Sequence, residues 1–200
     1  MIECTPTQLQ LALPFMQKIP QPVLPQAVVQ GFNPGRVFLD DLENPSAALV
    51  WTACGYLFAG GNPHSAVLER RLAALLANRL IPDSHALGNR GFVLIVDAET
   101  WEPRLDALMG GRSLIKTYRR PFRYLEPSFD AWKDWKSRLQ QGFSIRRIDA
   151  ALLKQPELLA EVRTTWGSEE EFLRKGFGFA ALRGSELVSY CITAFVSLSA

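Results

Sequence analysis

The sequence predicts an α+β fold, an α/β-type sandwich in which a mixed, largely antiparallel sheet carries flanking helices. Short runs of β-branched and aromatic residues, bounded by Asn-Pro and glycine, follow one another within residues 36–61. Residues 143–196 then give the order strand, helices, strand, strand. Hydrophobic residues make up 48% of the 200 positions, which is typical of a globular chain with a core of its own.

The organisation along the chain predicts four parts. Residues 1–35 are rich in Pro and Gln, so we expect them to wrap a surface with short helices only. Residues 36–126 are expected to form a first α/β unit, residues 127–142 a linking helix, and residues 143–200 a second unit.

Elements of the first unit follow from its hydrophobic pattern. Residues 36–41, 47–53 and 55–61 predict an antiparallel meander. Asn62 and Pro63 then predict the N-cap and first position of a helix that runs to about Arg79. The buried face of this helix is expected to carry Leu68, Leu72, Leu75 and Leu76.

Three further segments complete the first unit. The uninterrupted apolar run at residues 92–97 predicts a strand buried on both faces. Residues 99–109 predict a helix, and residues 112–126 predict one long strand or two. This last segment is basic and aromatic, but a net charge of +2 favours a solvated edge strand over a nucleic-acid surface.

Capping and turn residues mark the element boundaries of the second unit more clearly. Residues 143–149 predict a strand, followed by two short helices that divide at Pro156. Ser168 and Glu171 form a capping box for the next helix, and Gly176 is expected to end it in the left-handed conformation. Strands at 178–183 and 186–196 follow, with Cys191 expected to be a small buried residue.

Several classes of site are absent from the sequence. It contains no G-x-S-x-G, H-E-x-x-H or P-loop motif. The two histidines, His64 and His85, have no second ligand-type residue at metal spacing, so we expect no metal. Three scattered cysteines, no signal peptide and no apolar run of membrane-spanning length predict a cytoplasmic protein without a membrane anchor. The acidic cluster at residues 40–43 favours a turn, and a binding site for a substrate amine is the alternative.

A family resemblance rests on two stretches. Trp166, Gly167, Ser168, Phe172, Leu173, Gly176, Gly178 and Phe179, followed by residues 188–191 and 194–196, resemble GNAT-type acetyltransferases similar to the zwittermicin A resistance protein. Residues 36–61 resemble the amino-terminal half of the same family. The resemblance implies a degenerate GNAT-like first half and then the start of a GNAT domain.

The resemblance also implies a reaction and a cofactor. The resemblance implies a domain whose elements follow the order strand 1, two helices, and strands 2 to 4. It also implies that acetyl-CoA is held by strand 4 and by a following loop of the pattern R/Q-x-x-G-x-G/A. Neither strand 4 nor this loop can be matched after residue 196. We therefore expect the chain to be a fragment of an N-acetyltransferase that acts on small-molecule amines. Alone, this fragment is expected to be inactive and not to bind acetyl-CoA. A non-catalytic module that pairs into a homodimer through its last strand is the alternative. A third hypothesis places acetyl-CoA on the first unit, with residues 92–97 as strand 4.

Candidate site residues are few. Ser189 and Tyr190 lie on the last predicted strand and are candidates for the wall of a substrate groove. Trp166, before the capping box, is a third candidate for binding substrate, although packing against the following helix explains it as well. No catalytic, cofactor-binding or metal-binding residue is assigned.

Overall fold

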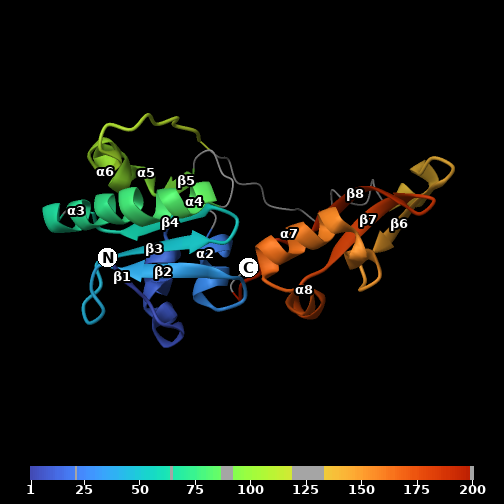
Figure 1. Ribbon diagram of the computed structural model, residues 1–200, viewed down its shortest axis with the longest axis horizontal. Helices are drawn as coiled ribbons and strands as arrows, with labels where there is room; N and C mark the ends of the chain where they lie inside the picture. The colour runs from blue at the N-terminus through green and yellow to red at the C-terminus, as the bar shows by residue number, and fades with distance from the viewer. Residues whose placement is uncertain (21, 64, 87–91, 119–132, 199–200) are drawn as a thin grey trace. The chain divides into compact units, whose positions relative to one another are not determined.

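The computed structural model describes residues 1–20, 22–63, 65–86, 92–118 and 133–198 (Figure 1). The chain divides into two compact units. Unit 1 comprises Met1–Thr117 with Phe195–Ala200, and unit 2 comprises Tyr118–Ala194.

Unit 1 is built on a five-stranded sheet. Its strands are β1 (Ile2–Glu3), β2 (Gly35–Leu39), β3 (Ala47–Thr52), β4 (Tyr56–Gly61) and β5 (Val93–Val96), in that spatial order. All neighbours are antiparallel except β4 and β5, which are parallel. The predicted meander within residues 36–61 is confirmed, whereas β1 was not expected from the sequence.

Helices cover both faces of this sheet (Figure 1). They are η1 (Pro6–Ala12), α1 (Leu13–Met16), α2 (Val23–Val29), α3 (Ala66–Leu75), η2 (Leu76–Leu80), α4 (Ile81–Ala86), α5 (Ala98–Trp101), η3 (Glu102–Arg104) and α6 (Leu105–Met109). Leu68, Leu72 and Trp101 join the core on one face. Met16 and Val28 join the core on the other face, so residues 1–35 are part of the packed unit.

The start of α3 differs from the prediction. Asn62 is not the cap, because its backbone N–H still bonds to Ser46 O at 2.9 Å and continues the pairing of β4 with β3. Ser65 is the N-cap, and its side chain accepts the backbone N–H of Leu68. The predicted apolar face is confirmed, since Leu68, Leu72 and Leu76 are buried.

The segment η2 between α3 and α4 is a π-helix. The N–H of Ile81 bonds to the carbonyl of Leu76, five residues earlier. The next residue, Pro82, has no N–H to place in an α-helical ladder, which explains why the helix widens here.

Two predictions about strands in unit 1 fail, one in part and one in the described residues. The strand predicted at residues 92–97 is present as β5, but it is not buried on both faces: it ends the described sheet, and Val93 is 41% exposed. Residues 112–118 form no strand in the structure. Gly110 and Gly111, both at positive φ, turn the chain just before them, and no described strand pairs with them. Residues 119–126 lie outside the described residues.

Unit 2 contains a three-stranded antiparallel sheet of order β6-β7-β8. Its elements are η5 (Trp135–Arg138), β6 (Phe143–Arg147), η6 (Leu152–Lys154), α7 (Pro156–Trp166), α8 (Glu169–Lys175), β7 (Gly178–Arg183) and β8 (Glu186–Ile192). The predicted order of strand, helices, strand and strand is confirmed. Of the linking helix expected at 127–142, the described part contains only the single turn η5.

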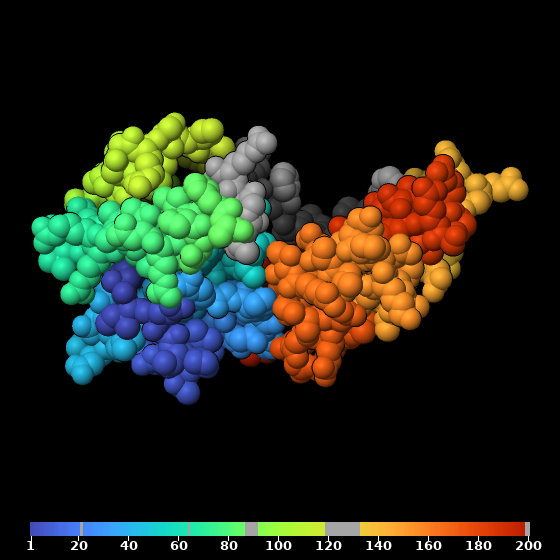
Figure 2. Space-filling view, in the orientation of Figure 1, coloured from blue at the N-terminus to red at the C-terminus, as the bar shows by residue number. Residues whose placement is uncertain are grey.

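One face of the unit 2 sheet is buried and the other is open. Ala180 and Leu182 of β7 are buried, as are Leu158 and Phe172 of α7 and α8. The orange atoms of these helices form much of the face of unit 2 that is turned to the viewer in Figure 2. Residues on the opposite face are exposed, and the expectation that Cys191 is buried is wrong because Cys191 lies on that face.

The two ends of α8 differ in how well the sequence predicted them. Ser168 is the N-cap, and its Oγ accepts the N–H of Glu171 at 3.2 Å, as predicted. Gly176 is not left-handed, because its φ of −101° and ψ of 179° are extended. A Cβ at this position would lie 2.8 Å from Trp166 and Phe172 and 2.9 Å from Thr193, so close packing explains the glycine.

Candidate functional site

A groove of about 590 Å³ runs along the outer edge of β8 in unit 2. Strand β8 is the last strand of the described three-stranded sheet, so this edge has no described strand beside it. The groove is lined by Gln155, Glu157, Ser185, Glu186, Leu187, Val188, Ser189 and Tyr190. It therefore joins the beginning of α7 to the hairpin turn and to the first five residues of β8.

Two of the candidate residues lie together in this groove. Tyr190 pairs with Ala180, and Ser189 pairs with Ala181, so their side chains point to opposite faces of the sheet. Both nevertheless line the groove, because it follows the edge of the strand. Tyr190 is 36% exposed.

The electrostatic character of the groove is acidic. Glu157 lies in the first turn of α7, and Glu186 opens β8. Glu186 forms an ion pair of 2.9 Å with Arg183, whereas Glu157 has no ion-pair partner among the described residues. None of the described residues that line the groove is basic, so the groove favours a cationic ligand.

Sequence reasoning missed Glu157 and Glu186. An acidic residue in the first turn of a helix is explained by the helix dipole alone, and Glu157 follows Pro156 in such a turn. Glu186 follows a tight turn, where charged residues are common. Only the folded arrangement brings these carboxylates, some thirty positions apart, to one groove.

Trp166 lies in the interior of unit 2 and is not among the residues that line the groove. Its indole Nε1–H donates to the backbone carbonyl of Thr193 at 2.8 Å. Its ring meets that of Phe172 edge-on, with the centroids 5.9 Å apart. These contacts join the end of α7 to α8 and to the segment after β8.

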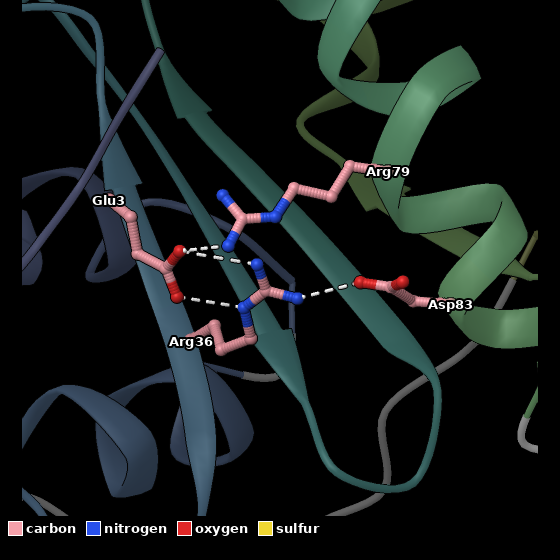
Figure 3. Close-up of polar contacts among 4 residues, drawn as sticks. All are labelled: Glu3, Arg36, Arg79 and Asp83. Atoms are coloured by element: carbon pink, nitrogen blue, oxygen red, sulfur yellow. Dashed lines mark hydrogen bonds and ion pairs between the residues drawn. The ribbon is translucent and has the colours of Figure 1, made fainter.

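A second hollow, of about 470 Å³, lies in unit 1 between α4 and the ends of β2 and β3. Two of its lining residues, Arg36 and Asp83, belong to a network of four charged residues, shown in Figure 3. Arg36 donates from Nε to Glu3 at 2.8 Å and from Nη1 to Asp83 at 2.9 Å, and Arg79 approaches Glu3 at 2.7 Å. The Arg36 guanidinium also lies over the rings of Phe38 and Trp51, at 5.2 and 5.5 Å from their centroids.

The charges of this network neutralise one another. Hydrogen bonding from Arg36 is the main cause that lowers the pKa of Glu3 below its ordinary value, and Arg79 adds to it. Hydrogen bonding to Glu3 in turn raises the pKa of Arg36. The ion pairs of this network hold β1 to β2 and to the π-helix. Because the network contains two cations and two anions, it has no net charge that would attract a ligand.

The acidic loop at residues 40–43 is also explained by its own hydrogen bonds. Asp40 accepts the backbone N–H groups of Ser46 and Ala47, and Asp41 accepts those of Glu43 and Asn44. Burial raises the pKa of Asp40, but the bonds from Ser46 and Ala47 outweigh it and hold that pKa below its ordinary value. These carboxylates cap a turn, as the sequence favoured.

The part of the chain that the structure describes offers neither a metal-binding cluster nor a membrane-spanning helix. Within it, no group of three histidine, cysteine or acidic side chains is arranged to hold a metal ion. No helix there is both long enough and apolar enough to cross a lipid bilayer.

Comparison with known proteins identifies the family. The sequence profile of the GNAT acetyltransferases matches residues 13–200. The chain belongs to the GNAT acetyltransferase family. An uncharacterized N-acetyltransferase of Bacillus subtilis (strain 168), YdfB, is 25% identical over 177 residues. That match covers 88% of this chain and 64% of YdfB, so the chain spans less than two thirds of the length of this GNAT relative.

The fold of this GNAT chain has a counterpart among solved structures. It is similar to a GCN5-related N-acetyltransferase-like protein from Streptococcus suis, with a TM-score of 0.61 and 16% sequence identity. The similarity covers 96% of this chain and 72% of the other. The mixed α+β fold with a mostly antiparallel sheet and flanking helices is thereby confirmed for the GNAT chain.

Proposed function

We propose that this chain supplies the amine-binding part of an N-acetyltransferase that moves the acetyl group of acetyl-CoA to an amine on a small molecule. The observation that supports the proposal is the acidic groove beside β8, which is lined by Glu157 and Glu186 and by the hydroxyl-bearing residues Ser189 and Tyr190. Family membership supports the reaction class, and the unlinked cysteines support a cytoplasmic location.

The groove suits the chemistry of an amine substrate. An aliphatic amine is protonated at neutral pH, so the carboxylate of Glu157 attracts it and orients it by a charge-assisted hydrogen bond, whereas Glu186 is already paired with Arg183. Ser189 and Tyr190 can accept from its N–H groups or donate to hydroxyls on the same molecule. In the transfer, the deprotonated nitrogen attacks the thioester carbon, a C–N bond forms, the C–S bond breaks, and the amine proton ends on the CoA thiol.

The described residues do not fit acetyl-CoA itself. The GNAT resemblance assigns the cofactor to a fourth strand and an R/Q-x-x-G-x-G/A loop, and the sequence contains no such motif. In unit 2 the described strands are β6, β7 and β8, which correspond to strands 1 to 3 of that order. We therefore propose that these 200 residues hold the amine but do not catalyse acetylation by themselves.

Nuclear magnetic resonance of the full chain tests the amine site. Putrescine, a diamine, is expected to shift the backbone amides of Leu187, Val188 and Tyr190, whereas butanediol is not. Glu157→Gln is expected to weaken the binding by about two- to five-fold, as for one exposed charge contact. The matched control Glu43→Gln removes an exposed carboxylate in unit 1 and should leave the binding unchanged. Equal shifts with the diamine and the diol would contradict the proposal.

A thiol-release assay tests the second part. The purified chain, mixed with acetyl-CoA and a panel of primary amines, is expected to release no CoA above the rate of spontaneous hydrolysis. Amine-dependent release would show that the chain is active and would refute this part, while leaving the assignment of the amine groove intact.

The open edge of β8 supports one alternative, which is pairing of this strand with β8 of a second copy. Val188 is 49% exposed on a strand without a described partner at its outer edge, a feature that invites strand addition. Light scattering over a wide concentration range decides this alternative, because a monomer at every concentration excludes it.

A further inference from the structure

The elements of unit 1 follow the order expected of a GNAT domain. Strand β1 comes first, the helical segments η1, α1 and α2 follow, and β2, β3 and β4 precede α3. The fourth strand is thus β4, and not the run at residues 92–97 that the sequence suggested for that place. By the family resemblance, the end of β4 and the loop that follows it are where acyl-CoA would be expected in unit 1.

The backbone at the end of β4 shows which groups a ligand would meet there. The N–H of Asn62 donates to Ser46, the residue just before β3, and the carbonyl of Gly61, in the same trans peptide group, therefore points away from β3. Strand β5 pairs with β4 only as far as Ala59 and Val96. The carbonyl of Gly61 therefore lies on the edge where β4 extends beyond the pairing with its parallel neighbour.

A side chain of the same unit already occupies this place. The indole Nε1–H of Trp101, from α5, donates to the carbonyl of Gly61 at 3.2 Å. Trp101 is 1% exposed and belongs to the core cluster that also contains Ala59, Leu68 and Leu108. The ring thus fills the space next to the end of β4, and its N–H satisfies the acceptor that a ligand would otherwise use.

The glycines at this position are explained by protein contacts. A Cβ on Gly60 would lie 2.4 Å from the backbone oxygen of Phe15, and a Cβ on Gly61 would lie 2.3 Å from that of Ser46. Both glycines let the chain's own backbones approach closely, and Gly61 also has a φ of +92°. In the following loop Pro63 has no N–H to offer a phosphate, and Ser65 caps α3.

We infer that Trp101 closes the acyl-CoA position in unit 1, so that unit 1 is a GNAT-type unit that binds no cofactor. Among the described residues at the end of β4, Gly60, Gly61 and the carbonyl of Gly61 are thus accounted for by contacts within the protein. This inference concerns unit 1 alone and does not depend on the groove in unit 2.

Resonances of the indole N–H and the Gly61 amide test this in the ¹⁵N-labelled full chain. The indole N–H of Trp101 is identified by its loss in Trp101→Phe. We expect neither resonance to move when CoA or acetyl-CoA is added, and the indole proton to exchange slowly in deuterium oxide. A saturable shift of both resonances with CoA would overturn the inference, and binding elsewhere in the chain would leave them in place.

Chemical rescue gives a second test. Trp101→Ala is expected to create an apolar cavity that free indole refills, so indole should raise the melting temperature of this variant but not that of the wild type. Stabilisation of the variant by CoA and not by indole would overturn the inference. If Trp101→Ala does not fold, the wild-type and Trp101→Phe spectra still decide the question.

Discussion

Both carboxylate oxygens of Glu3 accept hydrogen bonds from the guanidinium of Arg36, at 2.8 and 3.2 Å. This pair ties a strand of two residues, β1, to its neighbour β2. A strand so short has little backbone pairing of its own, so its attachment depends on side chains.

The pair predicts acid sensitivity of unit 1. The pKa of Glu3 is lower in the folded state than its ordinary value of 4.5, so its contribution to stability is present above that value and is lost as the pH falls through the folded pKa. We expect Glu3→Gln to cost about 1 kcal/mol at neutral pH and progressively less below pH of about 4. Urea unfolding across this pH range, with Glu43→Gln as control, measures the difference. A cost that stays constant with pH would contradict the prediction.

Glycines 176 and 184 are predicted to respond differently to the same substitutions. Gly184 has a φ of +61° and open space around it, so Gly184→Ala should cost about 1 kcal/mol and Gly184→Asn should recover part of this. At Gly176 the obstacle is contact with Phe172 and Trp166, so both Ala and Asn should cost about 1–3 kcal/mol. Thermal unfolding of the four variants measures this. Wild-type stability of Gly176→Asn would indicate a left-handed residue after all.

Trp166 is predicted to stabilise unit 2 through its N–H as well as its ring. Trp166→Phe keeps an aromatic ring against Phe172 but leaves the carbonyl of Thr193 without its donor, at an expected cost of about 1–3 kcal/mol. Hydrogen exchange of the amides of α7 and α8 should report the loss. Trp135→Phe, in the single-turn helix η5, is the matched control and should change stability little. An equal effect of both substitutions would contradict a specific role of the Thr193 bond.

The three free cysteines are predicted to react at different rates with iodoacetamide. Cys191 is exposed, whereas burial and the neighbouring Glu3 raise the pKa of Cys4 and reduce its thiolate fraction at neutral pH. Mass spectrometry of briefly treated protein should find Cys191 alkylated first and Cys4 late. Alkylation of Cys4 before Cys191 would be inconsistent with the partial burial of Cys4.

Much of the fold follows from local sequence signals. The meander within residues 36–61, the cap at Ser168 and the hairpin around Gly184 each depend on a few adjacent residues, and the sequence predicted them. Strand β1 was missed because two residues carry no periodicity, and Ile2 and Glu3 form a strand only by pairing with Leu39 and Phe38.

The candidate site was less predictable for the same physical reason. Ser189 and Tyr190 could be singled out on a strand, but the groove also needs Glu157 from the start of a helix. The bond from Trp101 to Gly61 joins positions forty residues apart. Such contacts depend on how helices return to the sheet, which local propensity does not determine.

The π-helical turn η2 lies between α3 and α4, so the number of residues in this helical segment sets the direction in which Asp83 points toward Arg36. An α-helix advances about 100° per residue. Removing one residue from Leu76–Leu80 would restore regular α-helical spacing and leave Asp83 directed toward Arg36, because the π-helical turn holds one residue more than an α-helical turn. The same single-codon deletion within the regular helix α3 would rotate Asp83 by about that angle, away from Arg36, and is thus expected to disrupt unit 1 more, because it displaces every later side chain of the helix together.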